Sequence, residues 1–320
     1  MKKILLRTLG VLAVLAAAGA WIWVKVGTIE TTPVAPDVEM LTGMGGNVGV
    51  LKTSIGAVVV DTMTFTSQGK SIRKKAEDFA GGNTVAIINT HYHLDHTHGN
   101  LAFSATTPVI ATRRTRQHLL ELDAGFWKGA EATLLPSNTF DDERVLEIGD
   151  KRVRCIWPGR GHTDGDLVVL FENERVLDAG DLFFNDRYPN IDLEAGGSIK
   201  EWIGTIDTIL ALDFDRVIPG HGEMSDKDGL RRFQDFLREL WSVGEAAARE
   251  HKTLAQTLHD AKLDTEKTMQ PIVVPFVVRF DHDFVIRRAW EEANGAVTYV
   301  PSPLPPAPTP IPSPENADRG

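Results

Sequence analysis

Cysteine is nearly absent from this 320-residue sequence: Cys155 is the only one, so no intramolecular disulfide bond can form. Cys155 alternates with other side chains in the apolar segment 153–157, a pattern that predicts a small buried side chain. A sheltered thiol of this kind is a poor nucleophile. The sequence therefore argues against cysteine-based catalysis.

Positive charge is also scarce. The chain has 34 Lys and Arg residues against 44 Asp and Glu residues, which gives a formal net charge of -10. Proteins that bind nucleic acids carry stripes of Lys and Arg that neutralise phosphates, and the sequence has no such stripe. The densest basic group, residues 113–116, is expected on the exposed face of a helix that ends near Leu122. We therefore expect a small-molecule substrate, no nucleic-acid partner and no obligate protein partner.

Long hydrophobic runs are rare, and the one near the N-terminus has the features of an export signal. Three basic residues precede a charge-free apolar run over residues 8–24. Residues 18–20 are small and offer a cleavage site, whereas Trp21 and Trp23 suit a membrane interface. Residues 1–27 are therefore predicted to be a signal peptide or an uncleaved membrane anchor. The protein is expected to be exported, to the periplasm or the extracellular space, and to stay on the membrane if this segment is uncleaved.

Proline is concentrated at the other end of the chain. It recurs at almost every second position between residues 301 and 314, so residues 301–320 are predicted to form an extended, disordered tail. Such a tail is a spacer, a docking peptide or plain disorder. About 270 residues remain without the two ends, enough for one main domain with a large core. We expect a catalytic domain over residues 38–225, with helices over residues 226–295 packed on it.

The run His91-Tyr92-His93-Leu94-Asp95-His96 places four metal-capable side chains within six residues. It follows the apolar segment 84–89, which is predicted to be a buried strand. Side chains at positions i and i+2 of an extended chain point the same way, so His91 and His93 can bind one ion. Asp95 and His96 are then left to face a second ion. Neutral imidazoles with one carboxylate suit zinc better than calcium or magnesium.

Three later motifs repeat this arrangement of a strand end, a Gly-rich turn and a His or Asp. GHTDGD contains His162, AGD contains Asp181 and PGHG contains His221, and each follows a short apolar segment. The chain has ten histidines, and five of them stand at strand ends in this pattern. Chance clustering is therefore a poor explanation.

The ordered set HYHLDH, GHTDGD, AGD and PGHG resembles the metallo-β-lactamase superfamily over about residues 38–225. The resemblance implies an α/β fold, a four-layer αβ/βα sandwich of two mixed sheets flanked by helices, with the metals at one edge. It also implies two zinc ions per chain. The ligands of the first zinc would be His91, His93 and His162. Those of the second would be Asp95, His96 and His221, with Asp181 as the bridge between the two ions.

Two adjacent zinc ions would lower the pKa of a bridging water from about 15.7 toward about 7 and would polarise a substrate carbonyl. Asp95 is expected to orient the resulting hydroxide or to pass a proton to the leaving group, which makes it the candidate catalytic residue. The expected protein is thus a metal-dependent hydrolase that attacks an ester-like carbonyl with a metal-bound hydroxide.

Asp181 also bears on the substrate. By the resemblance, many antibiotic-degrading members carry Cys or Ser at this position and a Lys soon after it, whereas ester, thioester and lactone hydrolases usually carry the bridging Asp. Here Asp181 is followed by Leu, Phe, Phe and Asn, with no Lys. We expect an ester, thioester or lactone hydrolase, and a β-lactamase that hydrolyses β-lactam amides is the alternative. Phe183, Phe184, Arg187 and Tyr188 are expected either at the lip of the pocket or in the core.

Two alternatives come from other classes of protein. An iron-dependent sulfur oxygenase on the same fold would use a single metal ion. A binding protein stabilised by structural zinc would have closed sites, usually with four protein ligands for each ion. Seven candidate ligands for two ions leave room for water, and this favours catalysis.

The residues between and beside the candidate ligands are assigned supporting roles. Tyr92 and Leu94 alternate with the ligands and are expected to face the core. His98 is expected to support a ligand or to face solvent rather than to bind a metal. Asp61, at the end of an apolar run, resembles the family's buried Asp beneath the ligand loop, and a simple strand-end cap is the other interpretation.

Several helices are predicted around the motifs. Residues 71–79 are polar and amphipathic and precede two glycines. Ser198 and Glu201 have the spacing of a capping box at the start of a helix. After the last candidate ligand, helices are expected over residues 226–251, 253–261 and 284–292. These helices would support the site or cover its mouth, and support is favoured.

Overall fold

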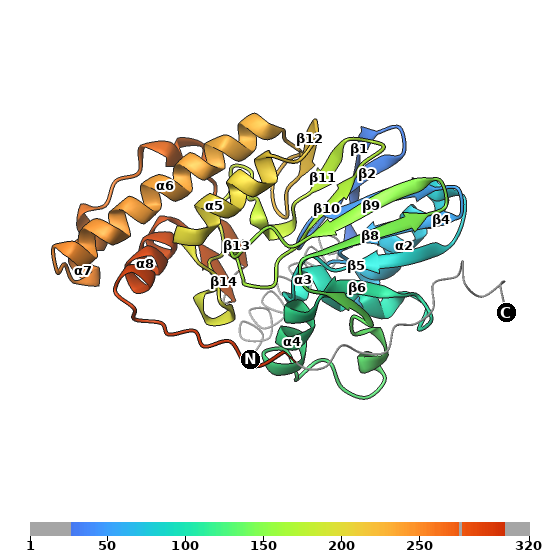
Figure 1. Ribbon diagram of the computed structural model, residues 1–320, viewed down its shortest axis with the longest axis horizontal. Helices are drawn as coiled ribbons and strands as arrows, with labels where there is room; N and C mark the ends of the chain where they lie inside the picture. Colours follow the sequence, from blue (N-terminus) through green and yellow to red (C-terminus); the bar gives the residue numbers. More distant parts are fainter. Residues whose placement is uncertain (1–26, 275–276, 305–320) are drawn as a thin grey trace, which may run out of the picture.

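The computed structural model describes residues 27–274 and 277–304 (Figure 1). The predicted export segment, except for residue 27, and most of the proline-rich tail lie outside the described residues. Within the described ranges, no helix combines the length and the apolar character that crossing a membrane requires.

The first half of the domain forms a seven-stranded mixed sheet with the strand order β1-β2-β3-β4-β5-β6-β7. Its strands are β1 (Glu30–Ala35), β2 (Val38–Thr42), β3 (Val48–Thr53), β4 (Gly56–Val60), β5 (Thr84–Ile88), β6 (Val109–Thr112) and β7 (Asn138–Phe140). Neighbours from β1 to β4 are antiparallel, and those from β4 to β7 are parallel. Because β1 pairs with β2, the sheet begins ahead of the expected domain boundary at residue 38.

The second sheet has five strands in the order β12-β11-β10-β9-β8. They are β8 (Glu143–Ile148), β9 (Lys151–Ile156), β10 (Val168–Phe171), β11 (Val176–Asp178) and β12 (Arg216–Ile218). All neighbours are antiparallel except β11 and β12, which are parallel. Val58 and Ile88 of the first sheet share one buried cluster with Val153 and Val169 of the second. The main core therefore lies between the two sheets.

Helices cover the outer faces of both sheets (Figure 1). The helices of the described residues are α2 (Thr66–Ala80), α3 (Leu94–Thr97), α4 (Arg113–Glu121), α5 (Ile199–Leu210), α6 (Lys227–Arg249), α7 (Leu254–Asp260) and α8 (His282–Ala293). α2 buries Ile72 and Ala76 against the first sheet. A small sheet of β13 (Ile272–Val274) and β14 (Val278–Phe280) lies ahead of α8. The predicted αβ/βα sandwich of two mixed sheets between helices is confirmed.

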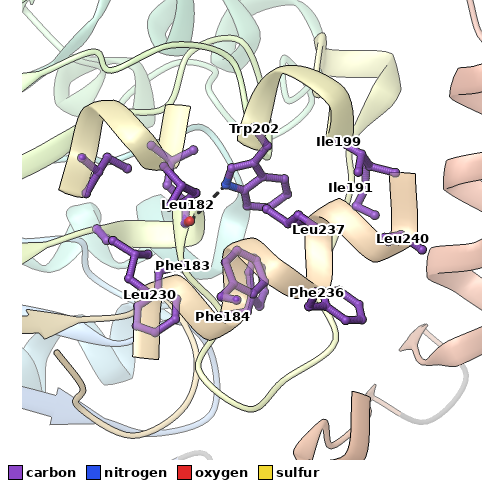
Figure 2. Close-up of a cluster of buried hydrophobic side chains, with 14 of the residues drawn as sticks. Leu182, Phe183, Phe184, Ile191, Ile199, Trp202, Leu230, Phe236, Leu237 and Leu240 are labelled. Atoms are coloured by element: carbon purple, nitrogen blue, oxygen red, sulfur yellow. Dashed lines mark hydrogen bonds between the residues drawn. The ribbon is translucent and has the colours of Figure 1, made fainter. Parts of the chain in front are cut away.

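α5, α6 and α8 pack on the second sheet through a large apolar cluster. Figure 2 shows Trp202 of α5 at its centre, where the indole Nε1 donates a hydrogen bond of 3.0 Å to the carbonyl oxygen of Leu182. Phe183 and Phe184 are 0% and 1% exposed within the same cluster. Of the two positions expected for these rings, the lip of the pocket or the core, they occupy the core, because the C-terminal helices bury them.

The helix predictions hold for the C-terminal part of the chain, where α6, α7 and α8 match the expected ranges. α2 begins at Thr66, earlier than the expected residue 71, because Gln68 caps its first turn through a 3.1 Å hydrogen bond from the amide of Phe65. Ser198 caps α5 as expected, accepting from the amide of Glu201 at 3.1 Å. The Glu201 carboxylate, however, binds Arg160 at 2.6 Å instead of closing the capping box.

Strand ends of both sheets bring the sequence motifs to one edge of the sandwich. Asp61 follows β4, and the HYHLDH run follows β5. In the second sheet, Asp181 follows β11 and His221 follows β12. Since β4 and β5 are parallel, and β11 and β12 are also parallel, each pair delivers its loops to the same edge.

Candidate metal centre

One set of side chains at this edge consists of His91, His93, His162 and Asp181, which we call the first donor group. Their ligand-type atoms all lie within 4.8 Å of one another. Nδ1 of His93 and Nε2 of His162 are 2.8 Å apart. Oδ2 of Asp181 lies 3.5 Å from Nε2 of His162 and 3.7 Å from Nε2 of His91. Three imidazole nitrogens and one carboxylate oxygen thus converge on one point.

Asp95, His96 and His221 form the second donor group, and their ligand-type atoms also lie within 4.8 Å of one another. Oδ2 of Asp95 is 3.5 Å from Nε2 of His221 and 3.8 Å from Nε2 of His96. Oδ1 of Asp181 lies 3.2 Å from Nε2 of His96 and 3.5 Å from Nε2 of His221. Asp181 therefore turns one oxygen toward each donor group.

Three of the converging atoms are buried and make no hydrogen bond within the described part of the chain: Nε2 of His91, Nε2 of His96 and Oδ1 of Asp181. Buried polar atoms are nearly always paired, because burial without a partner costs free energy. Imidazole nitrogens and carboxylate oxygens without hydrogen bonds are suited to a metal ion, and this mixture of donors suits zinc. The residues present therefore fit the metal centre that the sequence predicted.

In four of the five imidazoles, the nitrogen that points away from the donor groups is held by a neighbour. These contacts are Nδ1 of His91 to Oγ1 of Thr90 (3.0 Å), Nε2 of His93 to Oδ2 of Asp192 (2.9 Å), Nδ1 of His96 to Oδ2 of Asp61 (2.7 Å) and Nδ1 of His162 to the carbonyl oxygen of Asn190 (2.9 Å). Such partners fix the tautomer and the orientation of a metal-binding histidine. Four rings are thus oriented by the protein itself.

Asp61 supports the loop directly. Its carboxylate accepts hydrogen bonds from the amide of Thr90 at 2.8 Å and the hydroxyl of Thr90 at 2.6 Å, besides its contact with His96. The backbone at Asp61 has a φ of 63°, a left-handed conformation that is uncommon outside glycine. The supporting role expected from the family resemblance matches these contacts better than a simple strand-end cap.

Burial and neighbouring charges set the protonation of the first donor group. Burial lowers the pKa of His162 to about 4, and burial together with the nearby His96 lowers the pKa of His91 well below 6.5. Burial alone would raise the pKa of Asp181, but the surrounding histidines, His221 foremost, lower it well below 3.8. Burial lowers the pKa of His93 as well, but its hydrogen bond to Asp192 raises that pKa above 6.5 overall. His162 and His91 as neutral imidazoles and Asp181 as a carboxylate are in the protonation states that bind a metal.

Asp192 was missed by sequence reasoning. It precedes a short 3₁₀ turn, Leu193–Ala195, and caps it through a 3.0 Å hydrogen bond from the amide of Ala195. Its carboxylate also accepts from the hydroxyl of Tyr92 at 2.5 Å. No motif marked Asp192, since an acidic residue before a turn is an ordinary cap. Tyr92, expected to have a packing role only, therefore also positions the partner of His93.

Leu94 and His98 complete the loop. Leu94 was expected to face the core, but its side chain is 49% exposed because α3 begins at this residue and turns it outward. His98 belongs to none of the metal-type groups among the described residues. Its ring stacks on that of Phe126, with the two ring centroids 3.4 Å apart. Its Nε2 lies 2.7 Å from Oδ2 of Asp123. These contacts of His98 stabilise the end of the loop.

The family model of the metallo-beta-lactamase superfamily matches residues 41–221, a range that includes every member of both donor groups. The chain belongs to this superfamily. Like its homologues in the family, it is a metal-dependent hydrolase. Members generally bind zinc, and the His and Asp side chains of the two donor groups could hold it.

Relatives named metallo-beta-lactamase type 2 occur in Bacillus sp. (strain 170) and Bacillus cereus. They are 27% and 26% identical over 226 residues, which is 67% of this chain and 84% of each relative. The 2,4-dinitroanisole O-demethylase subunit alpha of Nocardioides sp. (strain JS1661) is 27% identical over 69% of this chain and 65% of that protein. These names belong to different reactions, so family membership by itself leaves the substrate open.

A solved metallo-beta-lactamase from Pontibacter korlensis superposes with a TM-score of 0.57 at 23% identity. The match covers 66% of this chain and 99% of that chain. This likeness shows the shared fold. Since the family model ends at residue 221, the long helices α6 and α8 lie beyond the matched range.

Proposed function

We propose that this chain is an exported dinuclear zinc hydrolase that cleaves an ester-like carbonyl bond in an ester, a thioester or a lactone. The observation that carries the proposal is the position of Asp181 between the two donor groups. Its Oδ2 faces His91 and His162, and its Oδ1 faces His96 and His221. A carboxylate placed in this way can bind two ions at once, one through each oxygen.

The seven side chains then divide into two sets. We assign His91, His93 and His162 to one zinc ion and Asp95, His96 and His221 to the other, with Asp181 shared. Zinc held in these sites supplies Lewis acidity and makes a nucleophilic hydroxide available near neutral pH. The protein's own contribution is to fix the number, spacing and tautomer of the donors.

Asp95 is the donor best placed for proton transfer. Its side chain is 29% exposed, whereas His96 beside it is fully buried. An exposed carboxylate at the edge of the centre can orient a nucleophile and then carry a proton to the leaving group. We therefore assign Asp95 two roles, second-site donor and proton carrier.

Three exposed apolar residues belong to segments that adjoin Asp95 or are hydrogen-bonded to such a segment: Met44, Phe65 and Leu94 are 37%, 45% and 49% exposed. A Cβ placed on Gly45, next to Met44, would lie 3.5 Å from Cβ of Asp95. Gln68 links the segment of Met44 to that of Phe65. Its side chain donates to the carbonyl of Met44 at 2.8 Å and accepts from the amide of Phe65 at 3.1 Å. Apolar side chains at this place favour a substrate with an apolar acyl or leaving group.

A β-lactamase is the second candidate, and the relatives named metallo-beta-lactamase type 2 favour it. Against it stand Asp181 in the bridging position and the absence of a Lys in the following residues Leu182, Phe183 and Phe184. Export would suit either enzyme. The proposal of export rests on the basic and then apolar sequence of residues 1–27.

The test uses the full-length protein loaded with zinc and supplied with a nitrophenyl ester, a thioester, a lactone and a chromogenic cephalosporin. We expect two zinc ions per chain and turnover of at least one of the first three substrates, abolished by a chelator and restored by zinc. Rapid hydrolysis of the cephalosporin alone would favour the β-lactamase. A single tightly bound iron with oxygen consumption would identify the oxygenase, and bound metal without any turnover would point to a binding protein.

A further inference from the structure

Residues that follow α8 also contact the domain. Residues 297–304, which we call the C-terminal strap, leave α8 and run back to α4 (Figure 1). Nη1 of Arg114 donates to the carbonyl oxygen of Ser302 at 2.9 Å, and Nε2 of Gln117 donates to that of Pro303 at 3.4 Å. Arg114, expected on the exposed face of α4, and its neighbour Gln117 are therefore partly covered by the strap.

Tyr299 of the strap contacts a loop that carries one of the candidate donors. Its hydroxyl donates to Oδ2 of Asp164 at 2.5 Å. The other oxygen of Asp164 lies 2.6 Å from Nε2 of His118, and Arg114 pairs with the same carboxylate at 3.1 Å. Asp164 is 9% exposed and belongs to the GHTDGD motif, two residues after His162. The strap thus binds the loop that carries a member of the first donor group.

That loop is joined to a second one, residues 191–198. The amide of Asp164 donates to the carbonyl of Ala195 at 3.0 Å, and the amide of Asp192 donates to the carbonyl of His162 at 3.1 Å. The carboxylate of Asp192 holds His93. The two joined loops therefore determine the positions of both His162 and His93.

α8 contacts the same loop from the other side. Nε of Arg288 donates to the carbonyl of Ile191 at 2.8 Å. The carboxylate of Glu292 accepts from the hydroxyl of Ser198 at 2.6 Å and from the amide of Ile199 at 2.7 Å. Arg288, Glu292 and Tyr299 all lie beyond residue 221, where the family model ends. The C-terminal extension therefore contacts the loops of the first donor group at three points.

The second donor group is held by other parts of the chain. Nδ1 of His96 lies 2.7 Å from Oδ2 of Asp61. The turn that carries His221 is held by Asn47, whose Nδ2 donates to the carbonyls of Pro219 and Gly222, each at 2.9 Å. Both supporting residues belong to the N-terminal half of the domain. Neither of these two supports is a residue of the C-terminal extension.

We propose that Tyr299 is a positioning residue for the first metal site, acting through Asp164 and the His162 loop, and that the second site is independent of it. The inference rests on the metal assignments of the proposed function. Loss of the Tyr299 hydroxyl should loosen the loop that holds His162 and, through Asp192, His93. Loss of an outer-shell partner typically lowers metal affinity about tenfold to 100-fold, and the lower end is expected for a contact that acts through a loop.

Tyr188 provides a matched control. The chain has three tyrosines, and the hydroxyl of Tyr188 also donates to a carboxylate of the C-terminal extension, Glu266, at 2.8 Å. Glu266 contacts His282 and neither donor group. Tyr188→Phe therefore removes the same kind of hydrogen bond, but one whose acceptor, Glu266, lies outside the two joined loops of the first site.

The experiment compares the full-length wild-type protein with Tyr299→Phe and Tyr188→Phe. Zinc dissociation constants for the two sites are measured by competition with a chromogenic chelator, and the visible spectrum of the cobalt-substituted protein reports the geometry of the site. For Tyr299→Phe we expect the affinity of one site to fall about tenfold, with a changed cobalt spectrum, and the other site to stay unchanged. For Tyr188→Phe both constants should match those of the wild type.

Thermal unfolding of metal-free and zinc-loaded protein separates positioning from simple stabilisation. Unchanged zinc affinities in Tyr299→Phe, or an equal fall at both sites, would overturn the inference, as would an equal loss of thermal stability with and without zinc. Wild-type protein that holds a single ion would instead contradict the dinuclear proposal. The role of Tyr299 would then be decided by whether the affinity of that one ion differs between the two variants.

Discussion

Oδ2 of Asp61 lies 2.7 Å from Nδ1 of His96, and both side chains are buried. The carboxylate stands at the end of β4, and the histidine stands in the loop after the parallel neighbour β5. The same carboxylate binds Thr90, which precedes His91. One acidic side chain thus links the ligand loop to the adjacent strand. It also orients His96 so that its Nε2 faces the other members of the second donor group.

Asp61→Asn should weaken metal binding at the second site. An amide carries less negative charge than a carboxylate and cannot accept through both of its ends, so the orientation of His96 and Thr90 would be less well held. We expect the zinc affinity of that site to fall about tenfold to 100-fold, measured by chelator competition. Asp123→Asn is the control, because it alters a His–Asp contact of 2.7 Å at His98, which lies outside the donor groups. Equal effects of the two substitutions would contradict the assignment.

Asp181→Ala should impair both sites, because each of its oxygens faces a different donor group. The loss of zinc affinity should exceed the roughly 100-fold that loss of an outer-shell partner costs, and hydrolysis should fall with it. Metal analysis after dialysis, together with turnover of the preferred ester, measures both effects. Unchanged metal content and unchanged hydrolysis would remove Asp181 from the bridging position.

Gly46→Ala should disturb the second site through steric overlap. A Cβ at this position would lie 2.2 Å from Cε1 of His96, so either the loop between β2 and β3 or the imidazole ring must move. Overpacking of this kind costs about 1–3 kcal/mol of unfolding free energy, and second-site zinc affinity should fall as well. Gly125→Ala is the control, since a Cβ there meets nothing within 4 Å. The unfolding free energy in urea and the zinc affinity are measured for both variants. Equal values for Gly46→Ala and Gly125→Ala would contradict the prediction.

Cys155 should be inert in the folded protein. Burial raises the pKa of its thiol from 9.0 to about 12, so the reactive thiolate is absent near pH 8. Because the folded-state pKa is raised, the thiol favours the folded state fully below pH 9, and this contribution is lost as the pH rises toward 12. A disulfide reagent at pH 8 should label native protein very slowly and urea-unfolded protein with one equivalent per chain. Fast labelling of the native protein would contradict this expectation.

The sequence pattern that marks the candidate donors is local. Side-chain alternation after a buried strand links His91 to His93, and short apolar segments before Gly-rich turns mark His162, Asp181 and His221. The same pattern misplaced Leu94, since alternation holds only while the chain stays extended and α3 begins at that residue. It left the position of Phe183 and Phe184 open between the pocket lip and the core, because their burial depends on helices that come later in the chain.

The family resemblance of the strand-end motifs implied the sandwich of two sheets. By itself, the sequence also marked the seven candidate donors, because such motifs are properties of short segments. Tertiary structure alone decided which neighbours orient them. Asp192 reaches His93 across 99 positions of the chain, and Tyr299 reaches Asp164 across 135. Contacts between residues so far apart in the sequence depend on how the two sheets and the C-terminal helices pack together. A local sequence pattern does not specify that packing.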